Sequence, residues 1–487
     1  MSRSRFASQR AALVAGAFAT LAALGGSSPS AQSQEAVTLA ALAARAAALE
    51  RVIGLIEDEK AVEKLQRIYG FYTDKQLWTQ AADLFADNGT IEVGGRGVYV
   101  GRDRVLALLK QNGPEFPQPG RLFDQMQLQP VVHVATDGRT AKGRWHMFAQ
   151  EAVHGEYARW GLGIFENDYV KEGGVWKIQR LHLYATMYTP YEDGWAKTAL
   201  PNEGPSSSLP PDRPPSVEYA AFPTAFVVPF HYDNPVTGAA AKSSAQSAAQ
   251  PNSGSATASV VSGARLSVPA EGKSEAAAAL AASLDVIEHR LGALEDLTQL
   301  ERMNAIYGYY LAHLQWDDLT GIFAPTGSIE IAMRGVYVGS ASVRRNLNLY
   351  GQATDSQFGL QHNHMQFQPV IDVAPDGQSA KMRSRALSIM GQWQRYSQWM
   401  GGVYENEYVK ENGVWKIKHD QVFNTYFVPY TVGWKTVMPR PPPGISDTNP
   451  PDLPPSLPFE MYPKPFLPPF HYSNPVTGAK VAWTPPP

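Results

Sequence analysis

The chain repeats itself, and the repeat restricts how it can fold more than any other feature. The hexapeptide Arg-Gly-Val-Tyr-Val-Gly at residues 96–101 returns 238 residues later, at 334–339. The pentapeptide Gly-Val-Trp-Lys-Ile at residues 174–178 returns after 239 residues, at 413–417. Because the spacing barely drifts along the unit, the sequence predicts two copies of one domain in tandem.

Each copy ends in a similar proline-rich segment. The sequence Asn-Pro-Val-Thr-Gly at residues 234–238 returns at 474–478. Proline accounts for 38 of the 487 residues, and much of it lies in these two segments. Such segments favour an extended polyproline conformation. They also contain many phenylalanines, which predicts tails that pack on their domains.

These features divide the chain into six predicted parts. An alanine-, serine- and glycine-rich stretch between the copies has no apolar periodicity and is typical of a flexible linker. The predicted parts are a signal peptide at residues 1–31, domain 1 at 36–200, a first tail at 201–238, the linker at 239–275, domain 2 at 276–438 and a second tail at 439–487.

The N-terminus is typical of an export signal. Arg3, Arg5 and Arg10 precede an apolar run at residues 11–24, which small polar residues follow. This order predicts a cleaved secretory signal, and therefore a periplasmic or secreted protein. An uncleaved anchor is the alternative, although the run is short for a span of ~20 residues. No membrane span is expected after the signal is removed.

Composition excludes several function classes. The net charge is −3, so no basic surface for nucleic acid is expected. The chain has no cysteine, which excludes disulfides, thiol catalysis, iron–sulfur clusters and cysteine zinc sites. Hydrophobic residues make up 44% of the chain, enough to fill two cores.

Helices come first in each copy and strands follow. The long first helix of copy two has apolar positions Leu280, Leu284, Ile287, Leu291 and Leu294, spaced as in a heptad seam; those of copy one are Leu42, Ala46, Leu49, Ile53 and Ile56. Packing on its own domain and coiled pairing of the two helices both remain open. The turn signals Asp137-Gly138 and Gly173-Gly174 separate later β-rich stretches. This order predicts an α+β fold.

Residues 400–408, Met-Gly-Gly-Val-Tyr-Glu-Asn-Glu-Tyr, and the following Gly-Val-Trp-Lys carry a family resemblance. They resemble the SnoaL-like branch of the nuclear transport factor 2-like superfamily, particularly hexachlorocyclohexane dehydrochlorinase and bile-acid dehydratase, and more distantly scytalone dehydratase. The resemblance covers residues 49–191 and 294–430. It implies two cone-shaped α+β-barrel domains, in which helices pack on a curved antiparallel sheet around an apolar pocket.

The resemblance also implies where a catalytic dyad would lie. In these lyases an aspartate late in the first helix orients a histidine on a strand, and the histidine abstracts a proton. Copy one has the acid, Asp74, but Gln125 at the histidine position. Copy two has the base, His364, but Ala312 at the aspartate position. Each copy therefore has an incomplete dyad, with Asp74 and His364 as the catalytic candidates.

Other residues could complete these sites. His146, His154 or His182 could reach Asp74, His313 lies beside the vacant acid position, and a composite site could join Asp74 to His364. The pocket candidates are Tyr72, Lys75, Gln125, His146, Tyr310, His313 and His362. The spacing of His362 and His364 could suit a metal, but no third ligand is evident nearby. No metal or cofactor is therefore expected.

Three pairs of repeated residues have structural interpretations. Trp176 and Trp415 alternate with other aromatic residues on predicted strands and are expected in the core. Glu92 and Glu330 on the first strand are expected on its outward face, with a place in the pocket as the alternative. His231 and His471 lie in the tail motif and predict a structural latch.

Three functions remain open on this sequence. The first is a binding module that holds a small apolar or aromatic molecule without turning it over. The second is a lyase or isomerase, of the dehydratase or dehydrochlorinase type, that abstracts a proton with one surviving dyad residue and a new partner. The third is a structural or assembly protein. Whether the chain forms a homo-oligomer or an internal pseudo-dimer also remains open.

Overall fold

The computed structural model describes residues 29–235, 237–240, 273–351, 359–437 and 444–483. Contacts between Cα atoms divide the chain into two compact units, of which unit 1 is Met1–Gly54 with Ala258–Gly292 and unit 2 is Leu55–Thr257 with Ala293–Pro487. Residues 1–28 of the predicted signal and 241–272 of the predicted linker lie outside the described residues. Export and the linker therefore stay predictions.

Unit 1 contains the N-terminal parts of two long helices, α2 (Pro29–Asp74) and α5 (Lys273–Ala312). Ala46 and Ile53 of the predicted seam are buried, whereas Leu49 is 43% exposed. A Cβ atom added to Gly54 would lie 3.5 Å from the guanidinium of Arg290. The two helices therefore contact each other inside this unit, through part of the predicted seam.

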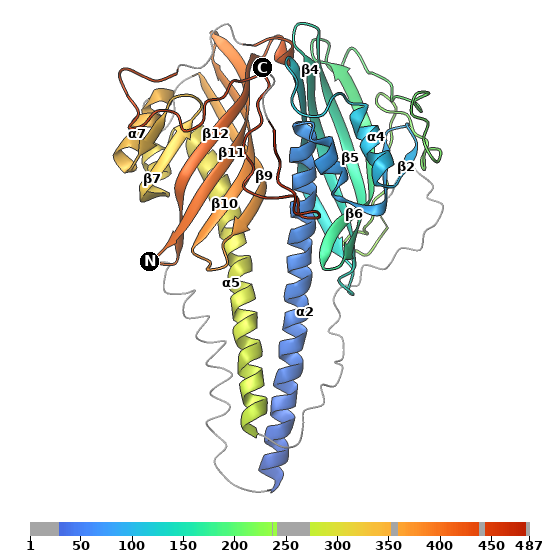
Figure 1. Cartoon of the computed structure of the whole chain (residues 1–487), viewed down its shortest axis with the longest axis vertical. Coiled ribbons are helices and arrows are strands. Elements are labelled where there is room, and N and C mark those ends of the chain that lie inside the picture. The colour runs from blue at the N-terminus through green and yellow to red at the C-terminus, as the bar shows by residue number, and fades with distance from the viewer. Residues whose placement is uncertain (1–28, 236, 241–272, 352–358, 438–443, 484–487) are drawn as a thin grey trace. The chain divides into compact units, whose positions relative to one another are not determined.

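Unit 2 contains two domains with the same order of elements (Figure 1). Domain 1 has the end of α2, then α3 (Trp78–Ala82), β1 (Phe85–Val93), β2 (Val98–Val100), α4 (Arg102–Lys110), β3 (Arg121–Val134), β4 (Thr140–Val153), β5 (Tyr157–Glu172) and β6 (Val175–Pro190). Domain 2 has the end of α5, then α6 (Trp316–Gly321), β7 (Phe323–Ile331), β8 (Val336–Val338), α7 (Ser340–Leu347), η1 (Asn348–Tyr350), β9 (Leu360–Val373), β10 (Ser379–Gln392), β11 (Tyr396–Glu411), β12 (Val414–Pro429) and η2 (Gly433–Lys435). The predicted α+β class and the tandem repeat are confirmed.

Each domain has one six-stranded sheet. The strand orders are β2-β1-β6-β5-β4-β3 and β8-β7-β12-β11-β10-β9. The sheets are mixed and not wholly antiparallel as predicted, because β1 runs parallel to β6 and β7 parallel to β12. In each domain the first strand lies beside the last one, and the chain then crosses through a short helix to the opposite edge of the sheet.

The repeated Gly-Val-Trp-Lys motif connects the sheet to the long helix. The indole Nε1 of Trp176 donates a hydrogen bond to Asp58 on α2 at 2.9 Å, and Lys171 pairs with the same carboxylate. In domain 2, Trp415 donates to Asp296 on α5 at 3.0 Å. Both tryptophans are buried, as predicted.

The Arg-Gly-Val-Tyr-Val-Gly motif is where the proline-rich segment lies against domain 1. The hydroxyl of Tyr99 donates to the carbonyl of Leu209 at 2.8 Å. Gly97 has φ of 92°, and a Cβ atom there would lie 2.7 Å from Pro211. Glycine is needed here because any side chain would push this segment away.

The two proline-rich segments are similar in sequence, but the first stays on its own domain and the second crosses to the other domain. The first contacts its own domain, where Ser216 donates through its backbone N–H to Glu92 at 2.8 Å. The second, from domain 2, reaches domain 1, where the Asn474 side chain donates to the carbonyl of Gln80 at 3.0 Å. Tyr472 is buried in the core of domain 1, with its ring 6.3 Å from that of Tyr72.

The domains pack on each other through equivalent residues. The rings of Trp160 and Trp399, which hold the same position in the two copies, lie 5.9 Å apart. The hydroxyl of Tyr191 donates to the carbonyl of Tyr430, again its own equivalent, at 2.5 Å. Contacts between equivalent residues are typical of a two-fold interface.

In the described parts of the chain, no helix combines the length and apolar character that a membrane crossing requires.

Candidate functional site

Domain 1 encloses a cavity of about 100 Å³ between its helices and its sheet. Most of its wall is apolar, and the first residues after domain 1, Leu200 to Glu203, close one side. The apolar lining comprises Tyr69, Trp78, Ile91, Val93, Leu108, Leu109, Phe123, Leu181, Leu183 and Ala185. Gln125, which holds the position of the missing histidine, also lines this cavity.

A polar cluster forms one part of the cavity wall. Glu151 on β4 lies directly across from Arg159 on β5, and the Nε of Arg159 donates to its carboxylate at 2.7 Å. The side-chain amide of Gln125 and the hydroxyl of Tyr188 each donate to the other oxygen of Glu151 at 3.4 Å. Glu151 is buried, so these three donors replace the water that its carboxylate loses.

Arg159 and Tyr188 of this cluster both stay protonated near neutral pH. Burial alone would lower the pKa of Arg159, but the adjacent Glu151 carboxylate outweighs burial and raises it. Burial raises the pKa of Tyr188 well above its ordinary value, so its hydroxyl stays protonated. The cavity therefore offers a ligand an ion pair, a phenol and an amide beside an apolar wall.

A glycine makes room for the tyrosine of this cluster. A Cβ atom at Gly161 on β5 would lie 2.5 Å from the ring of Tyr188. A similar close approach occurs in domain 2 at the next cross-strand pair, between Gly401 and Tyr426. The register of the sheet thus places an aromatic ring over a glycine, and the hydroxyl of Tyr188 extends to Glu151.

Asp74, the predicted acid, contacts a backbone N–H and an arginine and not a histidine. Its Oδ1 accepts a hydrogen bond from the backbone N–H of Gln125 at 2.6 Å, and its Oδ2 pairs with Arg385 on β10 of domain 2. The same guanidinium pairs with Asp124 on β3. All three side chains are buried. Asp74 therefore belongs to an ion triad that joins the two domains.

This triad borders a smaller cavity of about 40 Å³ at the domain interface, which Lys75 also lines. Burial lowers the pKa of Lys75 to about 8, although the Asp124 carboxylate opposes the shift. The predicted pocket residue Lys75 is thus placed in the interface cavity and Gln125 in the larger cavity of domain 1.

His364, the predicted base, is buried on β9 and engaged at both ring nitrogens. Its Nδ1 lies 2.7 Å from the hydroxyl of Ser388, and its Nε2 lies 3.1 Å from both the Tyr404 hydroxyl and the Gln366 amide. Burial lowers the pKa of His364 to about 3, and the neighbouring His362 adds to the shift. The ring is neutral at physiological pH, but it is a much weaker base than an ordinary imidazole.

A buried acid, Asp420, is connected to His364 through the side chains of Tyr307 and Tyr404. Burial raises the pKa of Asp420 on β12 to about 7. Asp420 accepts hydrogen bonds from the Tyr307 hydroxyl at 2.9 Å and from the Asn406 amide at 2.8 Å. The rings of Tyr307 and Tyr404 are 5.7 Å apart. The family dyad has its acid late in the first helix. The resemblance therefore could not indicate Asp420, which lies on the last strand.

The structure does not bring the other predicted partners to Asp74 or His364. His146, His154 and His313 are exposed, whereas His182 is buried and stacks on Tyr184 at 3.8 Å. Tyr72 packs on the second proline-rich segment, Tyr310 packs on the core of domain 2, and the Nδ1 of His362 lies 3.1 Å from the carbonyl of Leu311. Glu92 and Glu330 are buried and accept hydrogen bonds from Ser216 and Ser456, so they do not lie on an exposed outward face.

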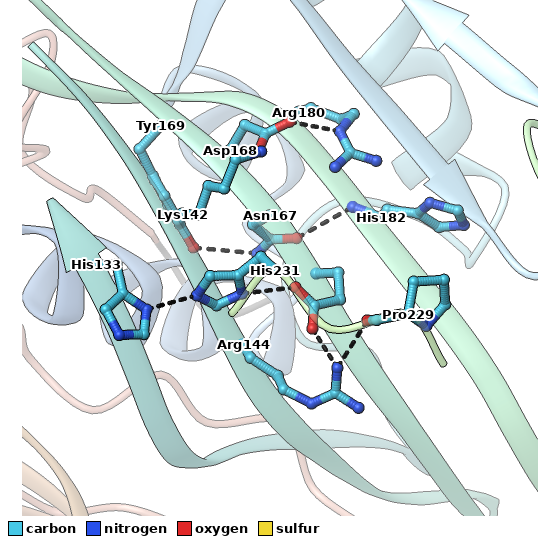
Figure 2. A network of polar contacts seen from close by, with 11 residues as sticks. His133, Lys142, Arg144, Asn167, Asp168, Tyr169, Arg180, His182, Pro229 and His231 are labelled. Carbon is cyan, nitrogen blue, oxygen red and sulfur yellow. Dashed lines mark hydrogen bonds and ion pairs between the residues drawn. The ribbon is translucent and has the colours of Figure 1, made fainter. Parts of the chain in front are cut away.

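His231 and His471 contact carboxylates on the sheets of their own domains. Figure 2 shows His231 between His133 and a carboxylate, which is that of Glu166 at 2.9 Å. Arg144 pairs with the same carboxylate and donates to the carbonyl of Pro229 at 2.8 Å. In domain 2, His471 lies 2.7 Å from Glu405. Both histidines thus hold a proline-rich segment on a sheet.

The second of these contacts should depend on pH. Burial would lower the pKa of His471, but hydrogen bonds to Asp372 and Glu405 outweigh it and raise the pKa above 6.5. Arg383 pairs with Glu405 and Lys64 pairs with Asp372 at the same site. A raised pKa means that the folded state binds the proton more tightly than the unfolded state, so this stabilisation is complete below pH 6.5 and disappears as the pH rises through the raised pKa.

We therefore expect His471→Gln to lower the free energy of unfolding by about 2 kcal/mol at pH 6 and by clearly less at pH 9. Urea denaturation at both pH values measures the difference. His313→Gln, at an exposed position, is the control and should change little at either pH. A loss for His471→Gln that is equal at the two pH values would contradict this explanation.

Among the described residues, no group of three or more histidine, aspartate and glutamate side chains is arranged to hold a metal ion.

Comparison with known proteins gives a family match in both copies. The model of the SnoaL-like domain matches residues 55–182 and again residues 292–420, together more than half of the chain. No curated protein sequence matches the chain.

Solved structures resemble single domains of the chain. A putative scytalone dehydratase from Novosphingobium aromaticivorans is 23% identical, with a TM-score of 0.26, over 31% of this chain and 98% of that one. Hexachlorocyclohexane dehydrochlorinase LinA-type3 from Novosphingobium barchaimii is 18% identical, with a TM-score of 0.24, over 29% of this chain and 92% of that one. An NTF2-like protein with a cystatin-like fold from Novosphingobium aromaticivorans is 21% identical, with a TM-score of 0.21, over 27% and 83%.

Proposed function

Since the chain belongs to the SnoaL-like domain family, we propose that domain 1 binds a small apolar or aromatic molecule that carries one polar group, and that neither domain turns it over. The observation that carries this proposal is the cavity of domain 1, with its apolar wall and the Glu151–Arg159 pair. Ligand pockets in proteins typically combine an apolar lining with a few fixed polar groups.

The shape of the polar cluster supports a phenol-like ligand. The aromatic part would contact Leu181 and Leu183, and its hydroxyl would exchange hydrogen bonds with Glu151 and Tyr188. Apolar cavities of roughly 150 Å³ in other proteins bind a benzene ring. A monocyclic compound is therefore the appropriate size class for a cavity of about 100 Å³.

The surroundings of Asp74 and His364, the side chains at the two dyad positions, favour binding without turnover. Proton abstraction requires a base whose pKa is near the working pH. The pKa of His364 is lowered to about 3, and Asp74 is paired with Arg385. Glu151 already accepts hydrogen bonds from three donors. None of these three groups therefore has the environment of an efficient general base.

A lyase or isomerase is the competing proposal, and two of the structural neighbours are named as a putative dehydratase and a dehydrochlorinase. The buried acid Asp420 is the observation that favours it, because its raised pKa would allow it to exchange protons near neutral pH. The two proposals differ in a simple outcome. A bound ligand is recovered unchanged in the first and converted in the second.

We test the binding site with two variants of domain 1. Ala185→Leu adds bulk to the cavity wall and should abolish binding of 4-bromophenol, whereas Tyr188→Phe removes one hydroxyl and should weaken binding about tenfold. Tyr188→Phe is a mild change, because domain 2 already has Phe427 at the equivalent position. Isothermal titration calorimetry measures the Kd, and circular dichroism checks that the variants fold.

The control is the reverse substitution at the equivalent position of domain 2. Phe427→Tyr should leave the affinity for 4-bromophenol unchanged. Unchanged binding by Ala185→Leu would place the ligand elsewhere and would overturn the assignment to domain 1. Elimination from a probe that carries a proton on the carbon beside a leaving group, followed by NMR of the mixture and lost in His364→Gln or Asp420→Asn, would instead support the lyase.

A further inference from the structure

One half of the interface between the two domains is formed and the equivalent half is not. In the formed half, Trp434 of domain 2 packs on Trp160 and Tyr191 of domain 1, with ring centroids 4.4 and 5.1 Å apart. The ring of Tyr462 lies 5.9 Å from that of His154. This half shows how a face containing Trp434 and Tyr462 accepts an aromatic edge of the neighbouring domain.

Domain 1 has its own copy of that face, and it is open. Trp195 and Phe222 hold the positions of Trp434 and Tyr462, yet they are 60% and 40% exposed. They border a groove of about 400 Å³, which we call the aromatic groove; its lining includes Leu162, Met187, Trp195, Tyr219, Phe222 and Phe226. Exposed apolar patches of this kind mark interaction surfaces.

Domain 2 in turn has an open copy of the edge. Trp393 holds the position of His154 and is 66% exposed, and Tyr430 holds the position of Tyr191 and is 56% exposed. Tyr396, at the start of β11, is 48% exposed. We call these three residues the aromatic edge. Tryptophan and tyrosine are the residues most enriched at the centres of protein interfaces.

The sequence itself makes the two halves unequal. The formed half is held by the ion pair of Arg385 with Asp74. The equivalent positions are His146 and Ala312, which cannot form that pair. The contacts of Trp160 with Trp399 already fix the packing of the two domains. Within one chain the groove and the edge therefore stay exposed although both domains are in place.

We propose that the aromatic groove of domain 1 binds the aromatic edge of domain 2 from a second copy of this chain. The formed half of the interface is the template, since Trp393 replaces His154 and Phe222 replaces Tyr462 in the same kind of contact. The groove continues an interface that the chain already uses. Each chain has one exposed aromatic groove and one exposed aromatic edge, so two chains can form both contacts reciprocally.

The absence of cysteine makes this proposal testable by cross-linking. Chains carrying Phe222→Cys and chains carrying Trp393→Cys, with different affinity tags, are mixed and treated with a short bismaleimide. The proposal predicts a cross-linked product that contains both tags. A mixture of Phe222→Cys with Tyr309→Cys is the control, because Tyr309 is 70% exposed but lies in neither surface.

A positive reference comes from the formed half. One chain with both His154→Cys and Tyr462→Cys should cross-link within itself. The proposal is overturned if the Phe222→Cys and Trp393→Cys mixture gives no more product than the Tyr309→Cys control. It is also overturned if a chain with both Phe222→Cys and Trp393→Cys cross-links only within itself at every concentration, which would mean that its own two domains close.

Sedimentation velocity tests the same contact without a linker. Trp393→Ala and Phe222→Ala should each weaken self-association at least tenfold, whereas Tyr309→Ala should not. Calorimetric binding of 4-bromophenol in the cavity of domain 1 confirms that each variant is folded if it binds, and unfolding temperatures serve this purpose if it does not. Self-association that is equal in all four proteins, or a wild type that remains a single chain at millimolar concentration, would contradict the proposal.

Discussion

Arg385→Met is expected to lower the free energy of unfolding of unit 2 by about 3–5 kcal/mol. The substitution removes the cation that pairs with both buried carboxylates, Asp74 and Asp124, and leaves them only the more distant charge of Lys75, which lines the same cavity. Such an uncompensated buried charge is more costly than loss of the pair itself, because the carboxylates have already lost their water. Urea denaturation of the wild type and the variant at pH 7 measures the effect.

A rescue experiment separates this explanation from a general packing defect. Adding Asp74→Asn and Asp124→Asn to Arg385→Met should restore most of the lost stability, since no buried carboxylate is then left without its paired cation. The control His146→Met, at the equivalent but exposed position of domain 1, should change stability by less than about 0.5 kcal/mol. A triple variant that is less stable than Arg385→Met would contradict the role of the triad.

Trp434→Ala is expected to have an effect of similar size, about 3–5 kcal/mol. Its side chain is fully buried and packs on Trp160 and Tyr191 of the other domain and on Tyr426 of its own. Truncation leaves a cavity the size of an indole in the interface, which neighbouring rings can fill only partly. Thermal and urea unfolding both report this loss.

The chain provides the matched control for this variant. Trp195 holds the equivalent position in domain 1 but is 60% exposed. Trp195→Ala should therefore cost less than about 0.5 kcal/mol in dilute solution, where chains do not associate. Equal losses for the two tryptophans would show that the two halves of the interface are equally closed, contrary to the asymmetry described here.

The sequence predicts the repeat and the fold class from local patterns and from the spacing between motifs, and the family resemblance implies the vacant dyad positions. It does not predict which residue pairs with Asp74 in place of the missing histidine. Arg385 lies on the other domain, and its contact with Asp74 depends on how two whole domains pack. Periodicity and motif spacing within one copy contain no information about such a contact.

The polar cluster of the cavity is a different case, because a local signal was present. Glu151 and Arg159 lie at equal distances from Gly155, the centre of a tight hairpin, and the register pairs them directly. Glu151 also follows Met147 and Ala149 at alternate positions of a strand, so it shares their buried face. A charged residue at the end of an inward-facing apolar series, opposite a charge of the other sign, indicates a functional or structural pair.

The parallel pairing of β1 with β6 and the different ends of the two proline-rich segments could not be predicted. Strand order depends on which edge the chain reaches after its short helix, and the residues of β1 do not encode this choice. The two tail motifs are nearly identical, yet Asn474 reaches the other domain and donates to Gln80. Its surroundings decide that contact, not its own sequence.

We propose that domain 1 holds the ligand and that His364 does not act on it. A crystal of the full chain soaked with 4-bromophenol tests this directly, because the anomalous signal of bromine marks the bound molecule. We expect a single bromine peak between Leu181 and Leu183, with the phenol hydroxyl near Glu151. A bromine peak beside His364, or no peak in the cavity of domain 1, would contradict this expectation.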